Sequence, residues 1–169
     1  MFLIVLVHYD LDKPLKLATD ASNQDLGATL SHIFPDGSER PIVYVSRTLS
    51  KAEKNYSAIQ REALAIVYAV RKLHQYIIGK HFILDSDHKP LLALFGPKKG
   101  IPQIAASRLQ RWAVYLSAFD YNIKYKKGSA NGNADFLSRL TVNNIADKCQ
   151  CDKFDACEYL NYIESETES

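Results

Sequence analysis

The first 148 residues contain no cysteine, and the whole chain of 169 residues has three, Cys149, Cys151 and Cys157. An odd number of cysteines confined to one end excludes a disulfide framework for the fold. Their C-x-C-x5-C spacing offers three ligands with no fourth nearby, which disfavours a zinc site. Free thiols are typical of a reducing compartment, so we expect an intracellular protein.

Long apolar runs are also missing. The chain starts with seven apolar residues, Met1–Val7, but no basic residue precedes them, so the run does not match a secretory signal. No window reaches the roughly 18 apolar residues of a membrane span. Glycine and proline are few, at seven and six, and 47% of residues are hydrophobic, which excludes low-complexity and disordered chains. We expect a protein of a cytoplasmic particle or the nucleus, with no membrane partner.

Charge is distributed unevenly along the chain. Residues 141–169 hold two basic and seven acidic residues, which leaves 19 basic and 12 acidic residues in 1–140. A basic body is compatible with a phosphate-bearing partner, and a solvated charged surface fits it equally well. We expect residues 8–140 to form one domain and 141–169 to be a disordered acidic tail. Residues 1–7 are expected to be a leading strand or the end of a truncated upstream segment.

Hydrophobic periodicity predicts the order of the secondary structure. Short apolar or alternating segments predict strands at 15–19, 27–34, 41–45, 81–84 and 121–125. Helical spacing predicts helices between Ser50 and Gly79, and at 90–95, 105–119 and 133–140. Ser50 and Glu53 have the spacing of a capping box, which marks a helix start, and Gly79 is a natural stop. This order predicts an α/β (α+β) fold with one five-stranded mixed sheet and helices on both faces.

Four acidic residues lie where they can meet at one edge of that sheet. Asp20 and Asp87 end strands, Glu62 lies beside the apolar stripe of the long helix, and Asp135 begins the last helix. Carboxylates packed together repel, so such a cluster is stable mainly when cations neutralise it, and carboxylate oxygens suit Mg²⁺ or Mn²⁺. The alternatives are a turn residue for Asp20 and a first-turn helix residue for Asp135. Glu62 is harder to explain structurally, because a carboxylate against apolar side chains costs desolvation.

Several longer segments carry a family pattern, in order and without a large gap. They are ATDAS (18–22), GATLSH (27–32), PIVYVSRTLSKAEKNYSAIQREALAIVYAVRKLHQYIIGKHF (41–82), SDHKPLLALF (86–95), SRLQRWAVYLSAFDYNIKYKKG (107–128) and NGNADFLSRL (131–140). Together they resemble the ribonuclease H domain of gypsy-like LTR-retrotransposon reverse transcriptases. The resemblance implies the ribonuclease H fold and an endonuclease that cuts the RNA strand of an RNA–DNA hybrid, leaving 3′-hydroxyl and 5′-phosphate ends. It also implies two Mg²⁺ ions, with Mn²⁺ as a substitute.

The resemblance assigns a role to each of the four carboxylates. Asp20 bridges both metal ions, Glu62 holds one ion and orients the nucleophilic water, Asp87 binds the other ion, and Asp135 completes the site. Asp85 is an alternative to Asp87, because the two share a strand phase. The His-Lys-Pro-Leu that follows Asp87 favours Asp87 as the metal ligand.

The expected partners are a hybrid duplex and the polymerase and connection segments of a parent polyprotein, because the chain itself has no polymerase motif. The candidate contacts to nucleic acid are Ser22, Asn23, Arg47, Gln60, Arg61, Arg108 and Arg111. Two alternatives remain open for the whole chain. The first is a non-catalytic docking module, which shares the fold but lacks the four carboxylates. The second is a transposase or integrase of the same fold, which carries its acidic residues in the order Asp, Asp, Glu along the chain. The oligomeric state stays open.

Overall fold

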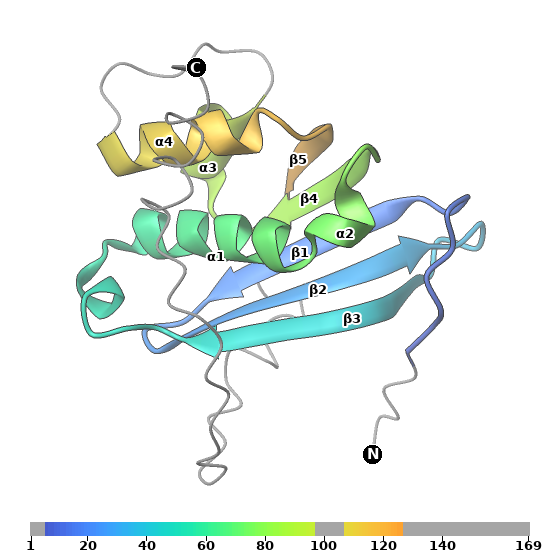
Figure 1. Ribbon diagram of the computed structural model, residues 1–169, viewed down its shortest axis with the longest axis horizontal. Coiled ribbons are helices and arrows are strands. Elements are labelled where there is room, and N and C mark those ends of the chain that lie inside the picture. Colours follow the sequence, from blue (N-terminus) through green and yellow to red (C-terminus); the bar gives the residue numbers. More distant parts are fainter. Residues whose placement is uncertain (1–5, 97–106, 127–169) are drawn as a thin grey trace, which may run out of the picture.

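The computed structural model describes residues 6–96 and 107–126, and within them a single mixed sheet forms the centre (Figure 1). Its strands are β1 (Leu15–Ala21), β2 (Asp25–Ile33), β3 (Glu39–Thr48), β4 (Phe82–Ser86) and β5 (Tyr121–Tyr125). The strand order is β3-β2-β1-β4-β5. β1 and β3 pair antiparallel with β2, whereas β1–β4 and β4–β5 are parallel. The expected five-stranded mixed sheet is therefore confirmed.

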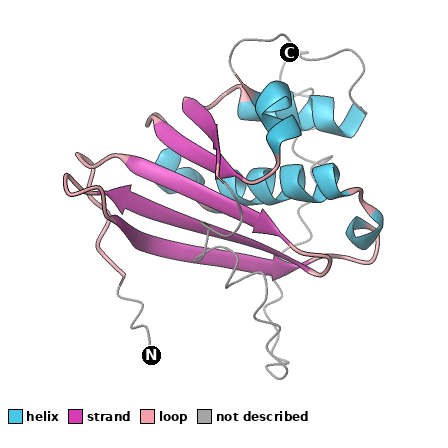
Figure 2. Ribbon diagram, turned by 180° about the vertical axis from the view of Figure 1, so that it is seen from behind, coloured by secondary structure: helices cyan, strands magenta, loops and turns pink. Residues whose placement is uncertain are grey.

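The described helices lie on one face of this sheet (Figures 1 and 2), so the helices that the sequence predicts on its other face stay a prediction. They are the 3₁₀ turn η1 (Glu53–Asn55) and the helices α1 (Ala58–Lys72), α2 (His74–Ile77), α3 (Lys89–Phe95) and α4 (Ser107–Leu116). None of them has the length and apolar character needed to cross a membrane. The helix expected at 133–140 and the acidic tail at 141–169 lie outside the described residues.

The core forms where α1 packs on β1 and β2. In β1, the side chains of Leu15 and Leu17 are buried, while the alternate residue Lys16 points to the other face. Ile66 and Val70 of α1 are fully buried in the same cluster. Each such side chain contributes roughly 1.5–3 kcal/mol by leaving water, and this packing fixes α1 above β1.

The long helix predicted from Ser50 starts later than expected. The Ser50–Glu53 capping contacts do form, because the Ser50 N–H donates to Glu53 Oε2 at 2.8 Å and the Glu53 N–H donates to Ser50 Oγ at 3.3 Å. They cap only η1, however, since Tyr56 is extended with ψ 146°. A second capping contact, from the Ser57 N–H to Gln60 Oε1 at 3.1 Å, starts α1. The prediction of a long helix from Ser50 is therefore wrong at its start, because α1 begins eight residues later, at Ala58, after the separate turn η1.

The C-terminal part of the predicted helix is interrupted and forms a separate short helix. α1 ends at Lys72, and Leu73, with φ −103° and ψ 11°, separates it from α2. Gly79 then adopts φ 67°, a left-handed conformation that glycine tolerates without strain, and the chain turns into β4. Gly79 is confirmed as the stop.

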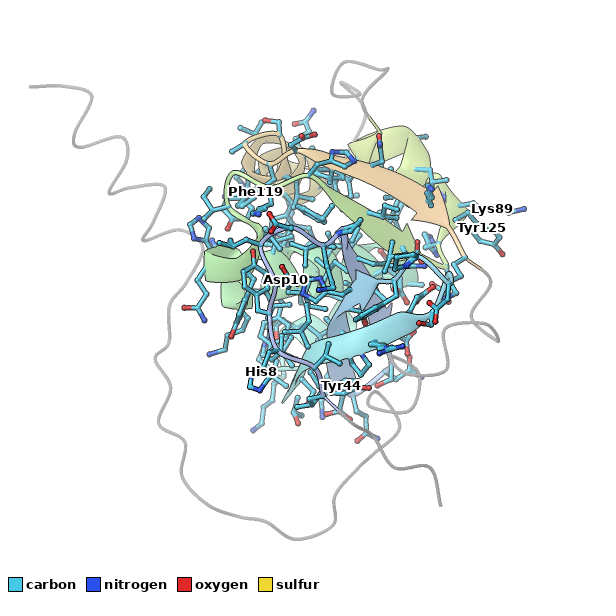
Figure 3. The ribbon with its side chains drawn as sticks, turned by 90° about the vertical axis from the view of Figure 1, so that its right-hand side faces the viewer. His8, Asp10, Tyr44, Lys89, Phe119 and Tyr125 are labelled. Carbon is cyan, nitrogen blue, oxygen red and sulfur yellow. The ribbon has the colours of Figure 1, made fainter. Side chains whose placement is uncertain are left out.

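The segment before β1 is tied to the sheet by backbone hydrogen bonds. The Val7 N–H donates to the Pro41 carbonyl at 2.9 Å, and the Asp10 N–H donates to His32 Nε2 at 2.9 Å. Figure 3 shows Asp10 on this segment, which runs along the outside of the strands. His32 is fully buried, so this contact anchors residues 7–10 to the start of the sheet.

Candidate metal centre

Three carboxylates from three different elements meet at one edge of the sheet. Asp20 lies near the end of β1, Asp87 directly follows β4, and Glu62 lies on α1. One oxygen from each lies within 4.8 Å of the others. β1 and β4 are adjacent and parallel, so their carboxyl ends emerge side by side. α1 packs on β1, and the Glu62 carboxylate reaches this edge.

The segment after Asp87 is fixed by contacts with the neighbouring strand. β4 pairs Ser86 with Tyr125 of β5, and the Lys126 N–H donates to the Ser86 carbonyl at 3.0 Å. Lys89, in the first turn of α3, holds its ammonium 4.9 Å from the centre of the Tyr125 ring, and Figure 3 shows this pair at the rim of the molecule. These contacts hold the chain on both sides of Asp87.

Glu62 is the carboxylate most affected by its surroundings. Its side chain is nearly buried, at 9% exposure, and burial together with the charges of Asp87 and Asp20 raises its pKa to about 8. A hydrogen bond from the Ala21 backbone partly opposes this rise in pKa. Within the described residues, Glu62 Oε2 is buried without a hydrogen-bond partner. The charged form of Glu62 is therefore disfavoured near neutral pH, and a bound proton or cation would relieve this cost.

The donor set fits a hard divalent cation. Three carboxylates offer only oxygen ligands, which Mg²⁺ and Mn²⁺ prefer, and neither His nor Cys belongs to the group. The buried oxygen of Glu62, which has no hydrogen-bond partner in residues 6–96 and 107–126, offers such an ion a ligand. The structure thus brings together three of the four predicted ligands, and Asp135 lies outside the described residues.

The structure separates Asp85 from Asp87. Asp85 is 2% exposed and lies with Oδ2 2.7 Å from Lys16 Nζ, and within the described residues it is not part of the carboxylate group. Asp87 is the residue that joins Asp20 and Glu62, as the sequence favoured. Lys16 was not among the predicted site residues, because its only signal in the sequence is a polar position alternating with two leucines.

Two of the predicted nucleic-acid contacts serve the backbone. Ser22 Oγ accepts hydrogen bonds from the N–H groups of Gln24 and Asp25, at 3.1 and 2.8 Å, and thereby closes the turn between β1 and β2. The Gln60 side chain accepts from the Ser57 N–H at the start of α1. Both side chains lie near the carboxylates along the sequence, and both have a structural role in the protein without nucleic acid.

The other predicted nucleic-acid contacts differ in how their side chains are held within the protein. Arg61 donates to the Tyr56 carbonyl at 3.2 Å, and the Arg108 guanidinium lies 4.2 Å from the centre of the Tyr56 ring. Asn23 and Arg111 are exposed. A role in nucleic-acid binding stays a prediction for all of them, and Arg61 and Arg108 both contact Tyr56.

Arg47 has a strong partner within the protein. Its Nη1 and Nη2 each donate to one oxygen of Glu53 at 2.8 Å, and its guanidinium lies 5.2 Å from the Tyr68 ring centre. We expect Arg47→Met to lower the free energy of unfolding by about 1–2 kcal/mol, because a bidentate, half-buried pair is stronger than an exposed one. Urea denaturation measures this, with exposed Arg111→Met as the control, expected to change stability by less than about 0.5 kcal/mol. An Arg47→Met protein with unchanged stability and weakened hybrid binding would contradict it.

The strand order and the carboxylate edge define a ribonuclease H fold, and solved structures agree. The foamy viral protease-reverse transcriptase in complex with an RNA/DNA hybrid matches with a TM-score of 0.57 and 16% identity, over 89% of this chain and 19% of that one. RNase H1 from Halobacterium salinarum matches with a TM-score of 0.52 and 20% identity, over 73% of this chain and 93% of that one.

Sequence comparison identifies the family. The family model described as an RNase H-like domain found in reverse transcriptase matches residues 10–119. The retrovirus-related Pol polyproteins of the Drosophila melanogaster transposons 297 and gypsy are 43% and 36% identical, over 79% and 88% of this chain. The chain belongs to the RNase H-like domain family of reverse transcriptases. It spans only 12% and 14% of those two polyproteins.

Proposed function

We propose that this domain is a divalent-metal-dependent endonuclease that hydrolyses the RNA strand of RNA–DNA hybrids. The observation that carries the proposal is the meeting of Asp20, Glu62 and Asp87 oxygens within 4.8 Å at one edge of the sheet. Membership in the RNase H-like family supports the reaction class, and the hybrid bound by the foamy viral relative supports the substrate. The polymerase and connection segments of a parent polyprotein are the proposed protein partners.

The carboxylates of the site have different roles in the proposed hydrolysis. Asp20, Glu62 and Asp87, with Asp135 as the predicted fourth ligand, would hold two Mg²⁺ ions. When bound, such a pair lowers the pKa of water and stabilises negative charge on the phosphodiester. Glu62 would hold one of these ions and orient the attacking water toward phosphorus. The water oxygen would form the new P–O bond and give up a proton to solvent. The bond from phosphorus to the 3′-oxygen would break, and that oxygen would take up a proton from solvent, so the products carry 3′-hydroxyl and 5′-phosphate ends.

Cleavage of an end-labelled RNA–DNA hybrid tests this function directly. We expect the parent protein to cut the RNA strand in Mg²⁺ or Mn²⁺ and to leave single-stranded RNA, duplex RNA and duplex DNA intact. Asp20→Asn removes a ligand with almost no change in size and is expected to reduce cleavage by about 10³-fold. A folded parent that binds the hybrid and the metal but cuts nothing would refute the enzyme and favour a docking module.

A further inference from the structure

A network of ion pairs crosses the face of the sheet that the described helices leave free. Lys16 of β1 lies 2.7 Å from Asp85 of β4 and 2.8 Å from Glu39 of β3, measured from Nζ to the nearest carboxylate oxygen. Lys126, just after β5, approaches the same two carboxylates at 3.9 and 3.7 Å. Two lysines and two carboxylates thus join β1, β3, β4 and the end of β5 into a neutral group.

The Lys16–Asp85 pair is buried to a degree that ordinary surface ion pairs are not. The Asp85 side chain is 3% exposed and that of Lys16 is 13% exposed. Burying two charges costs desolvation, and well-packed apolar residues at such positions are often at least as stable. A contribution to stability alone therefore does not explain a buried ion pair at this position. What it does provide is a defined distance between the two strands that carry it.

The position of the pair connects it to the metal centre. Ala18 and Asp85 form the last register pair between β1 and β4. Past this point β1 continues two residues to Asp20, and the chain continues from Asp85 through the end of β4 at Ser86 to Asp87. Their carboxylates meet Glu62 there, and like charges at this distance repel one another. The Lys16–Asp85 pair thus joins the two strands at their last paired position before the metal centre.

We propose that Lys16 and Asp85 are a positioning pair that fixes the spacing of Asp20 and Asp87, and thereby the affinity of the centre for its divalent cation. This inference deepens the proposed function and rests on its metal centre. The pair does not touch the ion. It acts through the backbone of β1 and β4, as the outer-shell groups of other metal sites act through their ligands.

Calorimetric titration of the full chain with Mn²⁺ at pH 8 tests the pair without any substrate. The decisive variant is the double substitution Lys16→Met/Asp85→Met, which removes both charges, leaves the net charge unchanged and avoids a buried unpaired charge. We expect it to stay folded by circular dichroism and to bind Mn²⁺ about tenfold more weakly than the parent. Parental affinity in this folded double variant would overturn the proposal.

The single variants separate positioning from long-range charge. If the pair positions the strands, both Lys16→Met and Asp85→Asn should bind Mn²⁺ more weakly than the parent. If only long-range charge matters, Lys16→Met should bind Mn²⁺ more tightly, because a positive charge near the centre is lost. Tighter binding by Lys16→Met would therefore also overturn the proposal. Asp36→Asn is the matched control, because Asp36 is exposed, pairs with Arg40 at 3.8 Å and lies in the turn between β2 and β3. Its Mn²⁺ affinity should stay within about twofold of the parent.

The parent protein decides between the two proposals. A parent that binds Mn²⁺ but does not cut the hybrid refutes the proposed function and leaves the positioning pair to be judged by its variants. A parent that binds neither Mn²⁺ nor Mg²⁺ overturns both.

Discussion

Replacing Glu62 with glutamine is expected to abolish cleavage and, in the absence of divalent cations, to make the folded domain more stable. The first effect follows from the loss of a metal ligand and of the oxygen that orients the water, and we expect a decrease of about 10³-fold or more. The second follows from the cost of the buried charge, because burial and two neighbouring carboxylates raise the pKa of Glu62 to about 8.

The stabilisation has a defined dependence on pH. In the unfolded chain Glu62 titrates near its ordinary value of 4.5, well below its folded pKa of about 8. Below pH 4.5 the residue is protonated in both states and costs nothing. Between pH 4.5 and 8 the unfolded state loses the proton more readily, so the parent loses stability as pH rises. Above pH 8 the penalty is complete, at roughly 3–5 kcal/mol, and Glu62→Gln removes it.

Urea denaturation at pH 5, 7 and 9 in a chelating buffer measures this trend. The gain in unfolding free energy of Glu62→Gln over the parent should grow across the series. Glu53→Gln is the matched control, since hydrogen bonds from Arg47 and Ser50 outweigh burial and lower the pKa of Glu53. That variant should be less stable than its parent at pH 7 and 9. A Glu62→Gln protein that is destabilised at pH 9 would contradict the electrostatic account.

The sequence predicts the ends of strands better than the start of the helix that carries Glu62. Asp20 and Asp87 lie at the ends of segments whose alternating apolar residues, Leu15 and Leu17 in β1 and Phe82 and Leu84 in β4, mark the strands in the sequence. The start of α1 is ambiguous because Ser50 with Glu53 and Ser57 with Gln60 both have capping-box spacing. Tertiary contacts decide between them, since Glu53 is also bound by Arg47 of β3.

The contacts across the sheet lie beyond what the sequence can predict. Lys16 and Asp85 are 69 positions apart, and their approach depends on the parallel register of β1 and β4, which no local pattern determines. For the same reason the sequence could not separate Asp85 from Asp87 by strand phase. Lys16, the residue that pairs with Asp85, can be identified only once β1 and β4 are aligned.

The affinity of the centre for Mg²⁺ or Mn²⁺ is expected to rise steeply with pH, because the ion and a proton compete for Glu62. The carboxyl must lose its proton to act as a ligand, and its pKa is about 8. Apparent affinity should therefore increase about tenfold per pH unit between pH 6 and 8 and level off above that range. Binding of the ion that Glu62 holds should release close to one proton near pH 6.5, whereas an ordinary glutamate would already be ionised there.

Calorimetry of Mn²⁺ binding in two buffers of different ionisation enthalpy measures both the affinity and the protons released. Asp20→Asn provides the internal comparison, because the Asp20 charge contributes to the raised pKa of Glu62. This variant should bind more weakly, and its affinity should level off at a lower pH, since Glu62 then competes less strongly for protons. An affinity that is flat from pH 6 to 8, with no proton released, would show that Glu62 is already ionised in the folded domain. In that case Glu62→Gln would not stabilise the domain, and proton and cation would not compete for Glu62. The three carboxylates would then have to lie farther apart, or closer to water, than the structure places them.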